Sequence, residues 1–214
     1  MRIGMVISGG DVTGINNFVF QIGRLTQAGM VIFDGGIPGL LANNHREISQ
    51  RDLLDFSIAA IPVIQSGRTE KKLVQSEYEL IARQLKNARI DVLILAGGDG
   101  SLQFLHTLSQ SGVNCFGVGM TIDNDVFGSD YTLGFSTACE QVLKEVAKLR
   151  NTGRALPGRV FMVELLGGYC GELTLQSAIK ANADIALIPE CQIPVPQLAQ
   201  RITRRLEQDR KSVV

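Results

Sequence analysis

Two apolar runs that end in glycines constrain the fold of this chain more than any other feature. Residues 2–7 and 92–96 are short and strand-like, and each leads through a glycine-rich turn into a stretch with helical spacing of apolar residues. A strand that is apolar along its whole length is typical of a parallel sheet covered on both faces. Residues 30–33 predict another strand after the first helix, which completes a βαβ unit. The sequence therefore predicts an α/β fold with a parallel sheet.

The amino-acid composition allows a large core and argues against two classes of partner. Hydrophobic residues make up 45% of the 214 residues, and the formal net charge is zero. A neutral chain offers no general surface for nucleic acid or for a membrane, and no apolar run approaches the length of a membrane span. Met1 leads straight into strand-like residues without a signal peptide. We therefore expect a cytoplasmic protein that binds neither nucleic acid nor a membrane.

The cysteines and histidines predict neither a disulfide nor a metal site. The four cysteines form no C-x-x-C pair and stand in apolar surroundings, so we expect free, buried thiols. His45 and His106 are far apart in the sequence and lack the spacing of metal ligands.

The second half of the chain contains a candidate domain boundary. A long helical run begins at Phe135 and is broken by glycine and proline at residues 151–158. The elements expected after the break are a strand at 159–165, a helix at 171–181, a strand at 183–188, a helix at 194–208 and the start of another strand at 212–214.

Two carboxylates lie two residues apart in the stretch that follows the apolar run 113–118. Asp123 and Asp125 stand at the carboxyl end of this predicted strand, where an open α/β sheet usually binds its ligand. Two nearby carboxylates suit a site in which one acts as a base and the other helps to hold a metal that carries phosphate. The alternative interpretation is a solvated turn, which Asp and Asn also favour.

Two glycine-rich loops could bind phosphate. Gly9 and Gly10 follow the first strand, and residues 97–101 follow a later one, each at the start of a helix. Glycine lets backbone N–H groups approach phosphate closely, and the N-terminus of a helix favours anions. Neither loop matches the Walker or the G-x-G-x-x-G pattern. A tight turn between strand and helix is the alternative for each.

Four blocks of the sequence, which follow one another along the chain in the family's order, resemble the signatures of 6-phosphofructokinases. Residues 121–138 match T-I-D-N-D…G-x-D-Y-T-x-G-F-x-T-A, and residues 97–101 match G-G-D-G-S. Residues 8–16 open the chain in a similar way, and residues 164–175 look like the family's E-V-M-G-R-x-x-G-x-L-T-L block. Together the blocks cover most of the chain.

The resemblance implies an α/β fold with two Rossmann-like parallel-sheet domains, the second incomplete. Residues 1–137 would form the domain that binds the donor phosphates. Residues 138–214 would form part of the domain that binds the sugar phosphate. Because chains of the family run further, the resemblance also implies that the C-terminal third is lacking here.

The resemblance implies a phosphotransferase of glycolysis. The reaction would move a phosphoryl group to the 1-hydroxyl of fructose 6-phosphate and give fructose 1,6-bisphosphate. It would use Mg²⁺ and ATP, with pyrophosphate as the other possible donor. Members of the family are dimers or tetramers, so we expect a homo-oligomer.

The resemblance also assigns roles to matching residues. Asp123 matches the catalytic base, Thr121 a sugar-phosphate contact at the transfer point, and Arg68 an arginine that stabilises the moving phosphoryl group. Asp99 matches the residue that holds Mg²⁺. The expected donor-phosphate residues are Gly10, Arg68, Thr69, Gly98, Asp99, Gly100 and Ser101. The expected substrate residues are Thr121, Ile122, Asp123, Asp125, Arg159, Leu166, Gly167 and Gly168, with Arg159 on the sugar's 6-phosphate.

Several residues depart from the family's pattern or discriminate within it. Gly100 is the residue typical of ATP as donor, whereas Met120 is uninformative. Phe104 is expected to narrow the adenine region. Gly168 replaces the arginine of the last block, and Phe20 replaces an arginine that binds effectors.

Two other functions stay open from the sequence. NAD kinases share G-G-D-G, although the blocks around Asp123 argue against that interpretation. A catalytically impaired regulatory or binding paralogue, or a truncated fragment, would explain the loss of arginine at Gly168. The retained Asp123 argues for an enzyme, because a chain without catalysis has no chemical need of it.

Overall fold

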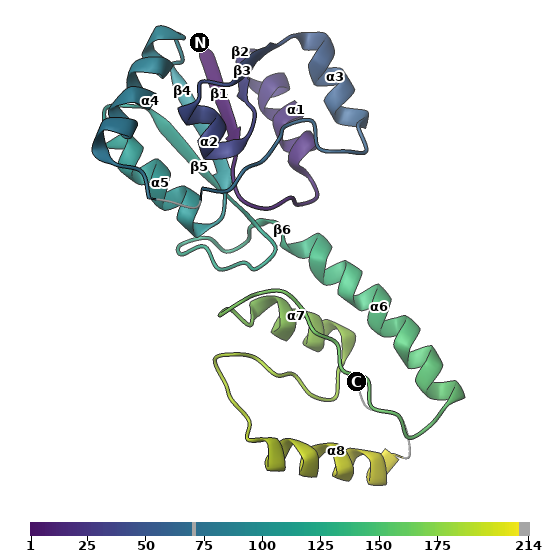
Figure 1. The fold of residues 1–214 in the computed structure, drawn as a ribbon. Helices are drawn as coiled ribbons and strands as arrows, with labels where there is room; N and C mark the ends of the chain where they lie inside the picture. The colour runs from purple at the N-terminus through teal and green to yellow at the C-terminus, as the bar shows by residue number, and fades with distance from the viewer. Residues whose placement is uncertain (70–71, 210–214) are drawn as a thin grey trace. The chain divides into compact units, whose positions relative to one another are not determined.

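The computed structural model describes residues 1–69 and 72–209, and the chain divides into two units (Figure 1). The first unit is Met1–Thr121 with Val126–Leu133, and the second is Ile122–Asp125 with Gly134–Val214. The short stretch after Thr121 thus belongs to a different unit from the strand that precedes it. The strand expected at 212–214 lies outside the described residues.

The first unit is built on a six-stranded sheet with the order β3-β2-β1-β4-β5-β6. Neighbouring strands β2, β1, β4 and β5 run parallel, whereas β3 is antiparallel to β2. This is the strand order of a Rossmann sheet, and the chain changes direction of growth between β1 and β4. The strands are β1 (Arg2–Ile7), β2 (Gly29–Phe33), β3 (His45–Ile48), β4 (Val92–Gly97), β5 (Cys115–Thr121) and β6 (Leu133–Gly134).

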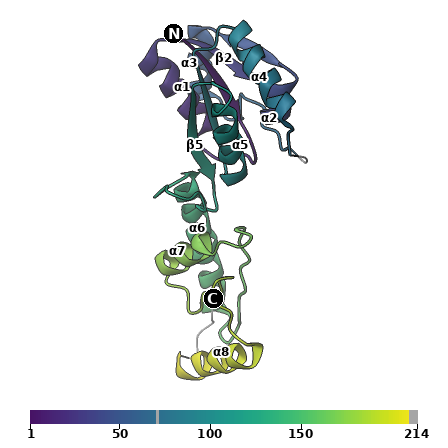
Figure 2. The same cartoon turned by 90° about the vertical axis from the view of Figure 1, so that its left-hand side faces the viewer.

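Helices cover both faces of this sheet (Figures 1 and 2). Met5 and Ile7 of β1 pack in one cluster with residues of α1 and α3, whereas Val6 packs in another with residues of α2, α4 and α5. Successive side chains of a strand point to opposite faces, so a strand covered on both sides must be apolar throughout. The helices are α1 (Ile15–Thr26), α2 (Gly36–Leu41), α3 (Gln50–Ile58), α4 (Gln75–Asn87) and α5 (Asp99–Ser109). The α/β class predicted from the apolar runs is confirmed.

The second unit contains α6 (Phe135–Ala155), α7 (Glu172–Ala181) and α8 (Val195–Asp209). The break predicted at 151–158 begins too early, because α6 continues through Gly153 to Ala155 before the Pro157–Gly158 pair. Phe135 and Cys139 of α6 pack against Leu173 of α7. An apolar cavity of about 130 Å³ is lined by residues of all three helices and of the segments 160–165 and 183–187.

The strands predicted at 159–165 and 183–188 are wrong. Among the described residues these segments form isolated bridges, including Ile188 with Cys191, and no ladder. Met162 is 81% exposed and Val160 is 46% exposed, so the apolar run is not covered as a buried strand would be. A strand is stabilised by its pairs across a ladder, and an apolar pattern without a paired neighbour does not form one.

The four cysteines are free, as expected, but they are not all buried. Cys139 is buried, Cys115 and Cys170 are partly accessible, and Cys191 is exposed. Burial raises the pKa of the Cys115 thiol from 9.0 to about 11, because the thiolate would lose hydration.

No helix in the described part of the chain has both the length and the apolarity that crossing a membrane requires.

We predict that Cys115 is alkylated slowly at pH 8, since a pKa of about 11 leaves only about one thiol in a thousand as thiolate. As the pH is raised toward this pKa, the thiolate fraction, and with it the rate of alkylation, should increase about tenfold for each pH unit. Iodoacetamide labelling followed by peptide mass spectrometry checks this, with the exposed Cys191 as internal reference. Equal rates at the two cysteines at pH 8 would contradict the prediction.

Candidate functional site

The first unit brings several of the predicted residues together at the carboxyl ends of β1 and β4. Gly9 and Gly10 follow β1, and Gly98 follows β4 as the N-cap of α5. These two strands are neighbours in the sheet, and the direction of growth changes between them. Ligands of open α/β sheets bind at this point, because the loops on its two sides diverge and leave room.

Because Gly97 has no side chain, the end of β4 can lie close to the backbone that follows β1. A Cβ on Gly97 would lie 2.6 Å from the carbonyl oxygen of Ser8 and 2.6 Å from the Cβ of Ser101. The Ser101 hydroxyl donates to Ser8 Oγ (3.0 Å), and Ser8 Oγ donates to the carbonyl of Gly67 (3.4 Å). Three segments that are distant in the sequence are therefore joined by one chain of hydroxyls.

The third of these segments, residues 63–69, is called the arginine loop because it carries Arg68. Gly67 forms a parallel bridge with Ser8, and the amide of Gly9 donates to the carbonyl of Gly67 (3.2 Å). The Ser66 hydroxyl donates to the carbonyl of Gly9 (2.7 Å). As a result, Nη2 of Arg68 lies 3.8 Å from the position that a Cβ on Gly10 would occupy. The structure thus places a guanidinium next to the first glycine turn.

Asp99 is exposed in the first turn of α5, and the N-cap residue, Gly98, makes no side-chain capping bond. Its Oδ2 accepts a hydrogen bond from Nε2 of Gln103 (2.6 Å), one helical turn away. A Cβ on Gly98 would be 4.0 Å from the Cβ of Thr121, and a Cβ on Gly100 would have no heavy atom within 4 Å. The uncapped N–H groups and the helix dipole make this end of α5 suited to an anion.

Thr69, another residue of the arginine loop, has a buried hydroxyl oxygen without a hydrogen-bond partner among the described residues. A buried hydroxyl without a partner costs free energy, so this oxygen is available to accept or donate a hydrogen bond.

The second unit holds the carboxylates of the T-I-D-N-D motif. Asp123 and Asp125 belong to it, whereas Thr121 belongs to the first unit. Asn124 between them has a φ of 55°, a left-handed conformation that turns the chain sharply. Cys170 Sγ contacts the carbonyl of Asp123 (3.5 Å), so the G-G-Y-C turn lies against the motif.

This turn contains two of the expected substrate residues, Gly167 and Gly168, and a third, Leu166, directly precedes it. The amide of Cys170 donates to the carbonyl of Gly167 (2.9 Å), and the side chain of Leu166 is 72% exposed. Gly168 has a φ of 59°, in the left-handed region that glycine adopts at no steric cost. Arg159 is exposed in the same unit.

The structure changes the interpretation of Phe104. This side chain is 7% exposed and stacks on Tyr78 of α4, with 5.4 Å between ring centroids. The expectation that it narrows an adenine pocket is wrong, because its position on α5 directs it into the core. Gln103, one residue earlier, also stands where the resembling family has a small residue, and its i,i+4 spacing to Asp99 is the signal of the contact that it makes.

The described residues contain no group of three or more His, Cys, Asp or Glu side chains that could hold a metal ion. A Mg²⁺ bound by a single carboxylate is nevertheless common where phosphate oxygens and water complete its shell. Asp99, exposed in the first turn of α5, fits that arrangement.

Comparisons with known proteins show which family the chain resembles. The family described as Phosphofructokinase matches residues 2–214. The ATP-dependent 6-phosphofructokinase of Blochmanniella floridana is 32% identical over 217 residues, which cover 100% of this chain and 67% of that protein. The same enzyme of Teredinibacter turnerae (strain ATCC 39867 / T7901) is 35% identical, with 88% and 60% covered. The chain therefore spans about two thirds of the length of these relatives.

Two solved structures are also similar. Phosphofructokinase from Saccharomyces cerevisiae superposes with a TM-score of 0.85 at 25% identity, over 99% of this chain and 33% of that one. The pyrophosphate-dependent phosphofructokinase from Marinobacter aquaeolei gives a TM-score of 0.79 at 19% identity, over 97% and 57%. The second likeness concerns the fold alone.

We predict that Gly97→Ala destabilises the protein, because the new methyl would overlap a backbone oxygen at 2.6 Å. Overpacking of this kind typically costs about 1–3 kcal/mol. Thermal unfolding followed by circular dichroism measures the loss. Gly100→Ala is the matched control, since its methyl meets no atom within 4 Å and alanine favours the helix. Similar unfolding temperatures for the two variants would refute the packing argument.

Proposed function

Because the chain belongs to the phosphofructokinase family, we propose that it transfers a phosphoryl group to the 1-hydroxyl of fructose 6-phosphate. The product is fructose 1,6-bisphosphate, and the step belongs to glycolysis. The observation that carries the proposal is the convergence of Gly10, Arg68 and the N-terminus of α5 at the switch point of the sheet. Such a group of donors suits the charged phosphates of a phosphoryl donor.

The donor phosphates bind to the first unit in this proposal. Backbone N–H groups at Gly10, Gly98 and Gly100 approach the phosphate oxygens, because no side chain at these positions stands in the way. Arg68 stabilises the charge that moves during transfer, and the hydroxyls of Thr69 and Ser101 complete the polar wall.

ATP is the donor that we propose, with pyrophosphate as the alternative to be tested. The space around Gly100 supports ATP, because a larger group there would crowd the nucleotide. The curated relatives are named ATP-dependent, which also supports this choice. Asp99 would hold Mg²⁺, which when bound neutralises charge on the donor phosphates.

Asp123 is the proposed general base. Its carboxylate takes the proton of the 1-hydroxyl as that oxygen attacks the phosphorus atom of the donor's terminal phosphoryl group. The bond from this phosphorus to the donor's bridging oxygen breaks, and the electron pair leaves with the shortened donor. Thr121, Ile122 and Asp125 contact the sugar phosphate near the point of transfer.

The remaining substrate contacts come from the second unit. Arg159 binds the sugar's 6-phosphate, and the backbone of the turn at Leu166, Gly167 and Gly168 borders the sugar. We further propose a cytoplasmic homo-oligomer, dimer or tetramer.

A catalytically impaired binding or regulatory chain is the second candidate. One observation favours it: Gly168 stands, with a φ of 59°, where the resembling block has an arginine. The loss removes a positive charge from the substrate side of the site. Assays of turnover and of substrate binding separate the two candidates, since an impaired chain binds without turning over.

We predict that Asp123→Ser lowers turnover by about 10²–10⁴-fold, because loss of a general base typically costs that much. A coupled assay of fructose 1,6-bisphosphate formation measures the effect, and circular dichroism checks the fold. Glu145→Gln, an exposed change on α6, is the control and should leave turnover unchanged. Near-normal turnover in the serine variant would remove Asp123 from the role.

The donor is tested by binding. In the presence of Mg²⁺, calorimetric titration should show tighter binding of ATP than of pyrophosphate. The physical reason is the room left by Gly100 for the rest of the nucleotide. Tight binding of pyrophosphate together with undetectable binding of ATP would reverse the assignment.

A further inference from the structure

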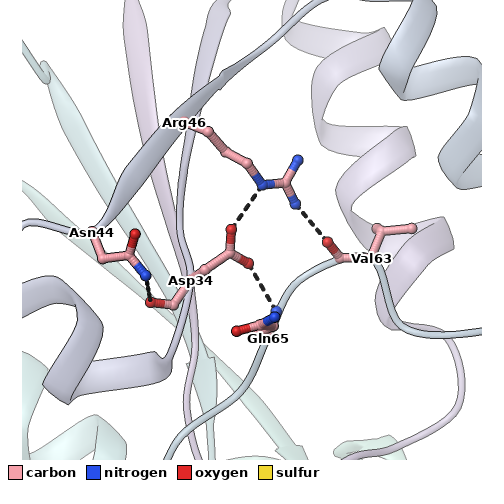
Figure 3. A network of polar contacts seen from close by, with 5 residues as sticks. All are labelled: Asp34, Asn44, Arg46, Val63 and Gln65. Carbon is pink, nitrogen blue, oxygen red and sulfur yellow. Dashed lines mark hydrogen bonds and ion pairs between the residues drawn. The ribbon is translucent and has the colours of Figure 1, made fainter.

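Asp34, at the end of β2, connects the sheet to the arginine loop (Figure 3). Its Oδ1 accepts from the backbone amide of Gln65 (2.9 Å), and its Oδ2 accepts from Nε of Arg46 (2.7 Å). Nη2 of Arg46 then donates to the carbonyl of Val63 (2.6 Å). One carboxylate and one guanidinium thus hold two backbone positions of the loop.

The pair is itself held firmly. The amide of Asp34 donates to the carbonyl of Asn44 (3.1 Å), and the side-chain amide of Asn44 donates to the carbonyl of Asp34 (3.2 Å). The side chain of Asp34 is 16% exposed and that of Arg46 is 42% exposed. Partial removal from water strengthens the attraction relative to an ion pair at the surface.

The arginine loop has little freedom between this pair and Arg68. Ser66 and Gly67, the two residues in between, bond to the end of β1. The amide of Gly35 donates to the carbonyl of Gln65 (2.8 Å), and a Cβ on Gly67 would lie 2.1 Å from the carbonyl oxygen of Gly35. The loop is therefore confined on both sides up to the residue before Arg68.

We propose that Asp34 and Arg46 are a positioning pair that sets the affinity of the site for the donor phosphates. Neither contacts the phosphates. The pair keeps the arginine loop in register with β1, so that the guanidinium of Arg68 stays beside Gly10. This inference rests on the proposed function and names the residues, distant from the phosphates, on which donor binding depends.

A general stabilising role would have a different signature. If the pair acts through Arg68, its loss matters for anion binding only while Arg68 is present. If it merely stabilises the first unit, its loss has the same effect with or without Arg68. A double-mutant cycle measures this difference.

The test uses the 214-residue chain and Mg²⁺–pyrophosphate, titrated by calorimetry. Asp34→Asn retains an oxygen for the amide of Gln65 but presents an NH₂ group to Arg46. We expect binding about tenfold weaker, since a misplaced guanidinium loses a charge-assisted hydrogen bond to phosphate. In an Arg68→Ala background, Asp34→Asn should cause no further loss.

Two further variants make the test specific. Arg46→Lys keeps the charge, but one ammonium cannot replace the two nitrogens that serve Asp34 and Val63, so it should weaken binding as Asp34→Asn does. It also carries the test if Asp34→Asn fails to fold. Glu47→Gln is the matched control, because Glu47 follows Arg46 on β3 and pairs instead with Arg2 (2.5 Å). It should leave the affinity unchanged.

The outcomes separate this inference from the proposed function. Unchanged pyrophosphate affinity in Asp34→Asn and Arg46→Lys, equal losses with and without Arg68, or no binding by the unmodified chain would each overturn the positioning pair. The expected cycle without any formation of fructose 1,6-bisphosphate would keep the pair and reject the proposed function. Formation of fructose 1,6-bisphosphate with an unchanged KM for the donor in Asp34→Asn and Arg46→Lys would support the proposed function and reject the positioning pair.

Discussion

Backbone contacts that glycine alone allows hold the candidate site together. A Cβ on Gly67 would meet the carbonyl oxygen of Gly35 at 2.1 Å, and one on Gly97 would meet that of Ser8 at 2.6 Å. Real Cβ atoms do not come this close to backbone, so these contacts depend on the absence of a side chain. Through them the ends of β2, β1 and β4 converge with the arginine loop. The candidate phosphate-binding groups are therefore placed by packing of the backbone rather than by flexible side chains.

This convergence gives the site its electrostatic character. The chain has a formal net charge of zero, so attraction of an anion must come from local groups. The N-terminus of α5 supplies backbone N–H groups and a dipole, and Arg68 supplies a full charge beside Gly10. Because the guanidinium of Arg68 is on a loop, its position depends on the contacts that hold the loop in place. The bonds from Asp34, Arg46 and the end of β1 meet that need.

The second unit shows how far a local pattern can be trusted. Its three helices form near the predicted places and pack through Phe135, Cys139 and Leu173, although α6 continues to Ala155, past the start of the predicted break. Its apolar segments lie beside a cavity and do not pair into a sheet within residues 134–209. An apolar pattern indicates that a segment can be buried. A strand, however, also needs a neighbouring strand with which its backbone forms hydrogen bonds.

The sequence by itself determined the α/β class, the family and, in the first unit, the strands β1, β2, β4 and β5 with the helices that follow β1 and β4, because apolar periodicity and the placement of glycine are local properties. It did not predict α2, β3 or β6. Through its resemblance to family motifs it also named Gly10, Arg68, Asp99 and Asp123 as candidate site residues. Tertiary structure alone decided that Phe104 packs in the core and that Arg68 lies beside Gly10. It also decided the contacts of Asp34 with Gln65 and of Ser8 with Ser101, which join residues 31 and 93 positions apart. No local pattern encodes such a contact, since it exists only once the sheet has brought the ends of its strands together.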